Sequence, residues 1–318
     1  MKFHRLDLNL LVTLDVLLSE KSITRAARRL NKSPSATSEA LGRLREFFED
    51  QLLTPIGRSM VPTPLGESLA ASVRQCLIHV RATVEARPVF DPAQSQRQFR
   101  LMLSDYVSTV LMSGVLQRLR REAPNVTIDM MPLMDDPRTA LDRGEFDFLV
   151  VPEHFRHEGH PWEELFRDEY VCATWSENPL VGESLTLEQF LELGHVRPSF
   201  GMWQRTPAIE EWFLARFGRE RRVEVVTTTF NNVPQLLVGT HRIATMHRRL
   251  AEYYVDRLPL RLLAPPLEMP PLIEIIQWHK YSSADPALHW MLGVLKECAD
   301  AGTDRPASPI RSRPAIAS

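Results

Sequence analysis

Residues 22–48 carry the pattern that most restricts how this chain can fold. A short helix is predicted over residues 23–30, and Asn31 and Lys32 interrupt it. Ser33 and Pro34 then predict a new helix start, because serine caps unpaired backbone N–H groups and proline has none to leave unpaired. This next helix should run to about Phe48. Its expected buried side consists of Ala36, Ala40, Leu41, Leu44 and Phe47 or Phe48. Such a pair of helices with a tight turn is typical of a helix-turn-helix.

The segments on either side of the helix-turn-helix predict the remaining elements of a small winged domain. A leucine stripe predicts a helix over residues 6–20, and Asp7, Asn9 and Asp15 within it favour an amphipathic helix over a signal peptide. Residues 52–55 and 59–62 predict two short strands around Gly57-Arg58, which would form a wing. We therefore expect an all-α winged helix-turn-helix domain over residues 1–63.

A long helix is predicted to follow, from Pro64 to about residue 87. Apolar side chains recur along it every three to four residues, at Leu69, Val73, Cys76 or Leu77, Val80 and Val84. An apolar stripe on a helix of this length indicates a dimer seam. Packing of the stripe against the protein's own body is the alternative. We interpret residues 64–96 as a linker and dimerisation helix with a hinge.

Beyond the hinge, strands and helices alternate, which predicts α/β lobes with mainly parallel sheets. Strands are expected over residues 99–103, 126–131, 146–151, 170–174, 195–198, 223–228, 243–246, 260–263 and 273–279. Helices are expected over residues 106–122, 136–143, 186–193, 206–217, 232–240, 247–256 and 285–300. We expect an effector-binding domain over residues 97–300. Its first lobe would comprise about 97–173 and 274–300, its second lobe about 174–273, and a disordered tail would cover 301–318.

Composition and charge narrow the class of protein. The chain is 44% apolar and 25% charged, and no apolar run is long enough to span a bilayer. Its three cysteines, Cys76, Cys172 and Cys298, are far apart, so we expect no disulfide framework and a cytoplasmic location. Residues 1–87 hold 13 Lys and Arg against 9 Asp and Glu, a net charge of +4, while the rest holds 25 against 31, a net charge of −6. This asymmetry favours a polyanion partner for the N-terminal part alone.

The segment ITRAARRLNKSPSATSEALGRLREFFEDQLLTPIGRSMVPTPLG resembles the LysR-type transcriptional regulators. The resemblance rests on Ala26-Ala27, residues 33–38, Arg43-Leu44 and residues 61–64, and it extends over about residues 3–300. The segments LDLNLLVTLDVLL and VFDPAQSQRQFRLMLSDY resemble the branch that contains NodD-type nodulation regulators and regulators of aromatic degradation. The resemblance implies a two-lobed, periplasmic-binding-protein-like sensor, a homodimer and homotetramer, promoter DNA as a partner and contact with RNA polymerase.

The candidate DNA contacts lie on the predicted reading helix and around it. Small hydroxyls and the positive helix start suit phosphates, and an arginine can bind a guanine edge with two donors. The candidates are Arg25, Arg28, Arg29, Lys32, Ser33, Ser35, Thr37, Ser38, Arg43 and, at the wing tip, Arg58. Members of the family commonly have Gln-Pro where this chain has Pro34-Ser35, which removes a side chain capable of reading adenine.

Candidate effector contacts follow the ends of predicted strands, where open α/β sheets bind ligands. They are Ser104, Asp105, Tyr106, Thr109, Pro152, His195, Arg197, Phe200, Trp203, Phe230, Asn232, Met246, His247 and Arg249. Aromatic side chains with histidine and arginine suit a planar phenolic or aromatic-acid effector, in aromatic catabolism or flavonoid-type signalling. The family resemblance implies that a histidine matching His195 and an arginine near Arg248 or Arg249 serve this purpose.

Other classes of function fit the sequence less well. His154, His157 and His160 are spaced by three, as zinc ligands on a helix would be, but Gly159 and Pro161 favour a solvated loop, so we expect no metal. No nucleotide-binding glycine motif or nucleophilic serine motif is present, so neither an enzyme nor a cofactor is expected. A purely architectural DNA binder would not need the long C-terminal region. A regulator controlled by a protein partner, or a constitutive one, remains the alternative.

Overall fold

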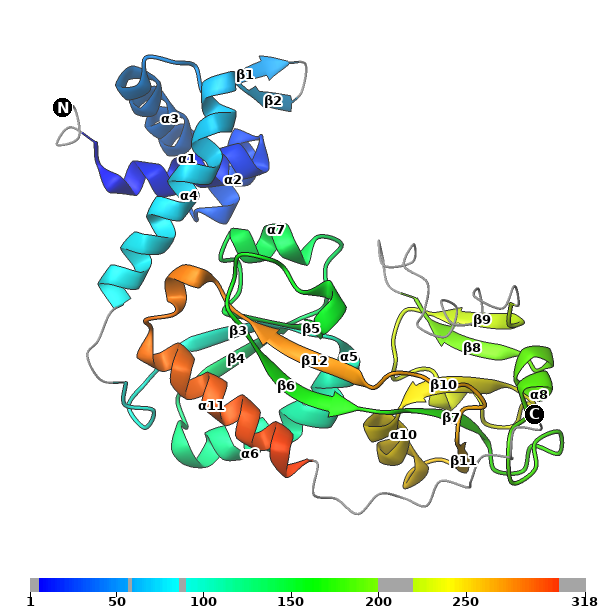
Figure 1. The fold of residues 1–318 in the computed structure, drawn as a ribbon. Coiled ribbons are helices and arrows are strands. Elements are labelled where there is room, and N and C mark those ends of the chain that lie inside the picture. Colours follow the sequence, from blue (N-terminus) through cyan, green and yellow to red (C-terminus); the bar gives the residue numbers. More distant parts are fainter. Residues whose placement is uncertain (1–5, 57–58, 86–89, 200–219, 303–318) are drawn as a thin grey trace. The chain divides into compact units, whose positions relative to one another are not determined.

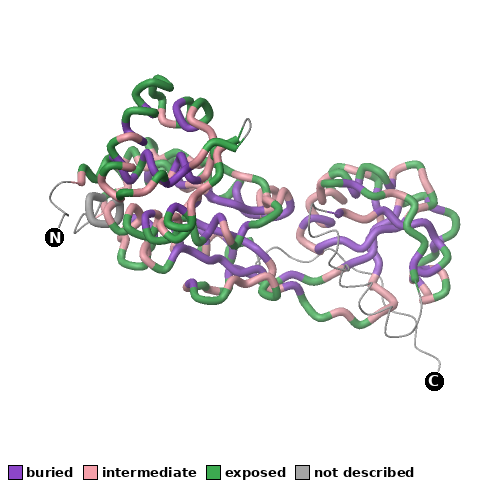
Figure 2. The backbone as a smooth tube through the Cα atoms, turned by 90° about the horizontal axis from the view of Figure 1, so that it is seen from above, coloured by how far each residue is buried: buried purple, intermediate pink, exposed green. Residues whose placement is uncertain are grey.

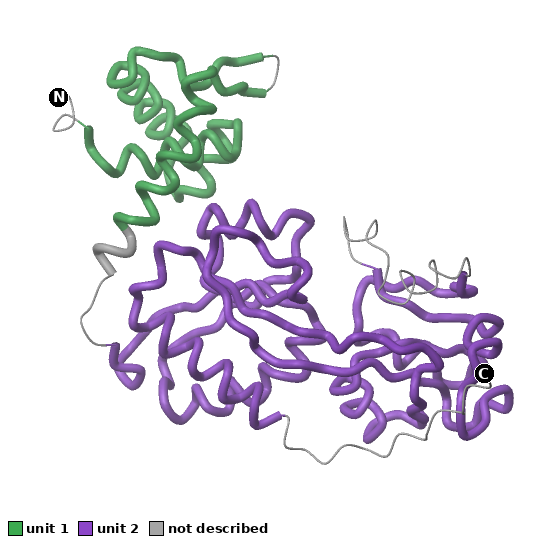
Figure 3. Tube along the Cα trace, viewed as in Figure 1, with its two compact units in different colours: residues 1–86 green, residues 87–318 purple. Residues whose placement is uncertain are grey.

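The computed structural model describes residues 6–56, 59–85, 90–199 and 220–302. The chain divides into two compact units, Met1–Ala86 and Arg87–Ser318 (Figure 3). The first unit contains α1 (Leu8–Glu20), α2 (Ile23–Arg29), α3 (Pro34–Phe48), β1 (Leu53–Ile56), β2 (Ser59–Pro62) and α4 (Pro64–Glu85), as labelled in Figure 1.

The first three helices begin where side chains satisfy their unpaired N–H groups. Asp7 accepts from the N–H of Asn9, Ser22 from that of Arg25, and Ser33 from that of Ala36. Between them lies a core whose largest members are leucines of α1 and α3. Leu14, Leu17, Leu41 and Leu44 are at most 1% exposed. Burial of each contributes about 1.5–3 kcal/mol, so this core holds the unit together.

The long helix α4 packs its first half inside the same unit. Val73 is buried, and Leu69 and Leu77 pack partly buried on the cluster formed with α1. Cys76 is exposed and Val80 is half-buried, while the side chain of Val84 lies outside the described set. The first half of the predicted seam is thus used within the unit, as the alternative interpretation expected.

The second unit holds two five-stranded sheets. The first has the order β4-β3-β5-β12-β6 and the second the order β11-β7-β10-β8-β9. The strands of the first sheet are β3 (Gln98–Met102), β4 (Thr127–Met131), β5 (Phe148–Pro152), β6 (Trp162–Asp168) and β12 (Leu272–Gln277). Those of the second are β7 (Tyr170–Trp175), β8 (His195–Pro198), β9 (Val223–Thr227), β10 (Ile243–His247) and β11 (Leu260–Leu263). We call the regions around these sheets lobe 1 and lobe 2.

Helices cover these sheets, and buried residues lie both along the strands and on the helices (Figure 2). The described helices are α5 (Asp105–Val107), α6 (Ser113–Glu122), α7 (Pro137–Asp142), α8 (Leu187–Glu192), α10 (Arg248–Val255) and α11 (Pro286–Ala301). A π-helical turn, Ser108–Met112, joins α5 to α6, and single 3₁₀ turns occupy Glu153–Phe155, Pro234–Leu236 and Lys280–Ser282. The predicted helix over residues 206–217 lies outside the described residues.

Three features of this unit differ from the sequence expectations. Strand β6 was not expected, and the segment 232–240 forms only a 3₁₀ turn. Gly239 has a φ of +71°, which a helix continuing to residue 240 does not allow. The sheets are mixed rather than mainly parallel. Among the described residues, four strand pairs are parallel and four are antiparallel. Antiparallel pairs arise because β6 runs on into β7 and β11 leads back into β12, so the chain crosses between the lobes twice.

Candidate DNA interface and effector site

The N-terminal end of α3 presents a small polar surface. Ser33 caps the helix, its hydroxyl lies 2.9 Å from that of Ser35, and Ser33, Ser35 and Ser38 are all exposed. Pro34 stands at the first helical position, where its missing N–H leaves nothing unpaired. Short hydroxyls beside unpaired N–H groups form a surface that can approach a phosphate or a groove floor closely.

Thr37 lies inside the unit, which corrects the expectation that it faces DNA. Its side chain is completely buried, and its hydroxyl donates to the backbone oxygen of Ser33 at 3.0 Å. Ala36, which was assigned to the buried side, is exposed. Helical spacing explains the difference, because positions 37, 40, 41 and 44 share one face.

Cationic side chains surround this surface. The side chain of Arg43 is 55% exposed, and its Nη2 lies 4.0 Å from a carboxylate oxygen of Asp7. Arg25 and Arg29 both pair with Glu20, at 3.4 and 3.1 Å. Such exposed pairs are worth little, so the arginines can exchange them for phosphates at small cost. Arg28 and Lys32 are exposed as well, and Arg58 lies outside the described residues.

The candidate effector residues of lobe 1 contact lobe 2 through polar groups. The carboxylate of Asp105 accepts the backbone N–H groups of Phe230 and Asn231 at 3.2 and 2.8 Å. The hydroxyls of Thr109 and Tyr254 donate to the side-chain oxygen of Asn231 at 3.1 and 3.0 Å. These bonds tie the start of α5 to the segment after β9, so part of the predicted site forms a junction between the lobes.

Aromatic rings gather around His247 at the same junction. Ring centroids of Tyr106, Phe230 and Tyr170 lie 4.2, 5.0 and 5.3 Å from that of His247. The imidazole is buried, and its Nδ1 has no hydrogen-bond partner within the described part of the chain. Burial lowers the pKa of His247 to about 3, so the ring is neutral at pH 7.

Two buried carboxyls lie beside this aromatic cluster. The hydroxyl of Tyr106 donates to Asp168 at 2.5 Å, and Asp168 also accepts the backbone N–H of Arg249. Burial raises the pKa of Asp168 to about 6, even though these hydrogen bonds lower it. Burial, with the charge of Asp168 nearby, raises the pKa of Glu274 to about 8. Glu274 is therefore mostly protonated at neutral pH.

His195 lies away from this cluster. It is the first residue of β8 and pairs with Ile243 at the start of β10, whereas His247 ends β10. Its Nε2 lies 2.6 Å from the backbone oxygen of Phe190, and burial lowers its pKa to about 4. Arg197 lies within β8 and is partly exposed, so neither residue follows the strand as expected.

Arg249 contacts the protein's own backbone. Its guanidinium donates to the carbonyl oxygens of Ala299 and Arg167, both at 3.2 Å, and lies 4.5 Å from the centre of the Phe166 ring.

The other predicted effector residues do not lie together. Ser104 caps α5, Met246 is buried, Pro152 is partly buried, Asn232 is exposed, and Phe200 and Trp203 lie outside the described residues.

Several residues of the junction were not predicted from the sequence. Asn231 was overlooked beside Asn232, and Asp168 and Tyr170 were not considered. Glu274 had the clearest signal, because it is the one acidic residue within the apolar strand segment LIEIIQ. A carboxyl in such a segment indicates a buried acid.

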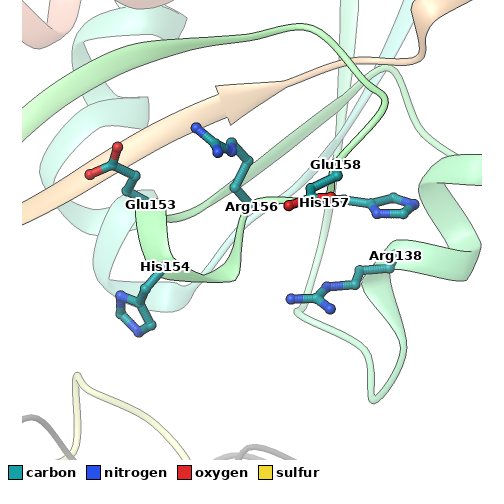
Figure 4. A pocket seen from close by; sticks show the side chains of 6 residues that line it. All are labelled: Arg138, Glu153, His154, Arg156, His157 and Glu158. Carbon is teal, nitrogen blue, oxygen red and sulfur yellow. The ribbon is translucent and has the colours of Figure 1, made fainter.

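Lobe 1 also carries a polar depression of about 560 Å³ (Figure 4). Its lining consists of Arg138, Glu153, His154, Arg156, His157 and Glu158. None of the predicted effector residues lines it. Glu153 and His154 belong to the 3₁₀ turn after β5, while residues 156–161 form a loop, as Gly159 and Pro161 indicated.

A helix-turn-helix unit joined to a two-sheet α/β unit of two lobes defines a DNA-binding transcription regulator with a sensor domain. The family models agree with this architecture. The model for the bacterial regulatory helix-turn-helix protein of the lysR family matches residues 8–67, and the LysR substrate binding domain matches residues 92–299. The chain belongs to the LysR family, and it is a transcriptional regulator rather than an enzyme. The predicted fold class and family are confirmed.

Proteins similar to this chain include two that are named nodulation proteins. Nodulation protein D 1 of Bradyrhizobium diazoefficiens is 44% identical over 297 residues, which cover 93% of this chain and 94% of that protein. Nodulation protein D 1 of Rhizobium tropici is 44% identical over 295 residues, covering 93% and 96%.

Solved structures share the fold. A probable transcriptional regulator from Pseudomonas aeruginosa has a TM-score of 0.63 at 32% identity and covers 93% of this chain and 98% of its own. A full-length OxyR variant from the same organism has a TM-score of 0.67 at 15% identity, covering 92% and 98%. Within the described residues, no helix combines the length and apolarity needed to cross a membrane.

Proposed function

We propose that this regulator reads promoter DNA with α3. The observation that supports the proposal is the exposed surface of Ser33, Ser35 and Ser38 in the first half of the helix, with the exposed Arg43 five residues beyond Ser38 in its second half. Arg43 would bind a guanine edge in the major groove. Arg25, Arg28, Arg29, Lys32 and Arg58 would bind phosphates, which adds affinity without sequence information.

Arg43→Ala tests this assignment. The variant should lose roughly 1–3 kcal/mol of binding to the operator but much less on random DNA, because only the operator offers the matched base edge. Gel-shift titrations at one fixed salt concentration measure both losses. Arg29→Ala is the matched control and should weaken operator and random DNA alike. Equal losses on both DNAs for Arg43→Ala would remove its base-reading role.

We propose a small aromatic or phenolic effector of the flavonoid or benzoate type, bound where the lobes meet. The proposal is supported by the rings of Tyr106, Tyr170 and Phe230 around a neutral, buried His247. Phenols can stack on such rings and bind an unpaired nitrogen. The 44% identity to nodulation proteins is consistent with an effector of this class.

Thermal shift measurements test the effector class. A ligand at 100 times its dissociation constant should stabilise the protein by about 2.7 kcal/mol. Phe230→Ala should weaken the effect at least several-fold, whereas Leu180→Ala, an exposed apolar residue of lobe 2, should leave it unchanged. If no phenol, benzoate or flavonoid stabilises the wild-type protein, control by a protein partner or constitutive activity becomes the better reading.

We further propose that the chain acts in the cytoplasm as a homodimer through α4, assembling into a homotetramer, and that it contacts RNA polymerase. Val80 continues the apolar stripe of α4 beyond the part packed in the first unit. The division of the chain into a domain over 1–63, a linker over 64–96 and a two-lobed domain over 97–300 belongs to the same proposal. Analytical ultracentrifugation measures the assembly, and a monomer at micromolar concentration would contradict it.

A further inference from the structure

Three metal-binding side chains meet on lobe 1, away from the aromatic cluster. They are Asp142 at the end of α7 and His157 and His160 of the loop before β6. The carboxylate oxygen Oδ1 of Asp142 lies 3.1 Å from Nε2 of His157 and 2.8 Å from Nε2 of His160. One ligand atom from each residue lies within 4.8 Å of the others. The three groups thus point at one small volume.

A buried side chain and a glycine turn fix the loop that carries the two histidines. The side chain of Gln277 is completely buried and makes two hydrogen bonds to the backbone of His157, accepting from its N–H at 2.8 Å and donating to its oxygen at 2.9 Å. Gly159 has a φ of +87°, a conformation that turns the loop sharply between the two histidines. A buried amide devoted to one loop residue indicates a preorganised site rather than a chance contact between surface groups.

The exposed fraction of the three side chains rises from His160 through His157 to Asp142, so the site is accessible from one side. The side chain of His160 is 3% exposed, that of His157 is 23% exposed, and that of Asp142 is 57% exposed. The ring of His279 packs 4.9 Å from that of His160 on the protein side. The site is therefore closed toward the lobe and open toward solvent at Asp142, which leaves room for a water ligand.

We propose that Asp142, His157 and His160 bind a divalent first-row transition metal ion, with zinc as the expected ion. Two imidazole nitrogens and one carboxylate oxygen suit such ions and disfavour calcium and magnesium, which prefer oxygen ligands throughout. Ligand atoms of a tetrahedral zinc site lie about 3.3 Å apart, so the observed separations from Oδ1 need only small expansion. The ion would connect α7 to the loop that Gln277 fixes on β12.

The hydrogen bonds of His160 define which of its ring nitrogens carries the proton. Nδ1 of His160 accepts the backbone N–H of Lys280 at 3.3 Å, which places the imidazole proton on Nε2. A metal ion on Nε2 would require the ring proton to lie on Nδ1 instead, so the bond from Lys280 would have to break.

His154 is not part of the proposed site, although the sequence spaces it regularly with His157 and His160. His154 belongs to the 3₁₀ turn after β5 and is not one of the three converging side chains. Figure 4 shows its ring pointing away from that of His157. The regular spacing of His154, His157 and His160 therefore does not define the site, and Asp142, distant from them in the sequence, replaces His154.

Cobalt titration of the chelator-treated, full-length protein tests the proposal. We expect one ion per chain with a visible d–d band. Cys76 is exposed, and a site formed by a cysteine would instead give an intense near-ultraviolet thiolate band. Asp142→Asn and His157→Ala should each weaken binding at least about tenfold. His154→Ala is the matched control and should bind as the wild type does.

The exposure of the two ligands makes these variants informative, since neither removes a core side chain. His160→Ala should also lose the band, but its burial makes it the variant most prone to misfold, so the conclusion rests on the other two. Circular dichroism checks that each variant is folded. Unchanged cobalt affinity in folded Asp142→Asn or His157→Ala would overturn the proposal, and so would a wild-type protein that binds no cobalt at millimolar concentration.

Discussion

The hydroxyl of Thr37 donates to an oxygen that already accepts the backbone N–H of the same residue. Thr37→Val keeps the buried shape and removes this second bond, while the acceptor stays satisfied. We expect a loss of about 0.5–1.5 kcal/mol in the stability of the first unit. All six tryptophans lie beyond residue 86, so far-UV circular dichroism should report the change while tryptophan fluorescence reports the second unit alone.

Ser35→Ala serves as the comparison for Thr37→Val. Ser35 is exposed and lies in the same turn, so its replacement should change stability little. A stability loss for Ser35→Ala equal to that for Thr37→Val would show that the turn, rather than the buried hydroxyl, is responsible.

At the residue scale, the burial of Thr37 could have been predicted from the sequence. Thr37 shares a helical face with Ala40, Leu41 and Leu44, so its burial followed from spacing, and only its polarity argued for the surface. The junction around Asp105 is a different case. Its location after β3 was predictable, but its bonds to Phe230 and Asn231 join positions about 125 residues apart and depend on how the lobes pack.

At the scale of elements, the start of α4 lies very close to the segment that precedes the wing. A Cβ added at Gly66 would lie 2.3 Å from the backbone oxygen of Leu52 and 3.4 Å from the side chain of Leu18. Because the nearest contact is backbone, it cannot move aside easily. Gly66→Ala should therefore destabilise the first unit by about 1–3 kcal/mol through overpacking.

Gly42 provides the opposite case on a neighbouring helix. A Cβ at this position of α3 meets nothing within 4 Å. Gly42→Ala should stabilise the unit by about 0.5–1 kcal/mol, since alanine favours the helix. Chemical denaturation followed by far-UV circular dichroism compares the two variants. Shifts of the same sign would contradict the close approach of α4 to Leu52.

Strand β6 shows why one element escaped the sequence analysis. Its residues, WEELFRD, do not alternate between apolar and polar, and only Leu165, Phe166 and Asp168 are buried. It lies at the edge of its sheet and pairs with β12 alone, with a register shift opposite Glu274 and Ile275. Its exposed residues Trp162, Glu164 and Arg167 interrupt any apolar run. Central strands such as β5 were recognised because burial on both faces requires a continuous apolar run.

At the scale of the whole molecule, buried titratable groups give opposite contributions to the pH dependence of stability. The pKa values of His247, His195 and His279 are lowered to about 3, 4 and 4. The stability that these neutral rings contribute is complete above the unfolded pKa of about 6.5 and is lost as the pH falls below it. Glu274 acts in reverse. Its raised pKa contributes stability at low pH that is lost as the pH rises toward about 8.

Stability should therefore be greatest near pH 7 and decline above it. Between pH 7 and 8 the ionisation of Glu274 in the folded state costs stability, while the three unfolded imidazoles lose their remaining charge and offset part of that cost. Wild-type stability should therefore fall by roughly 0.5 kcal/mol over this pH unit. Glu274→Gln cannot titrate at this position, so its stability should not decline over the range and should rise slightly. Urea unfolding followed by tryptophan fluorescence measures both profiles. Glu164→Gln, at an exposed acid of β6, should decline as the wild type does, and an equal decline in Glu274→Gln would show that another group controls the slope.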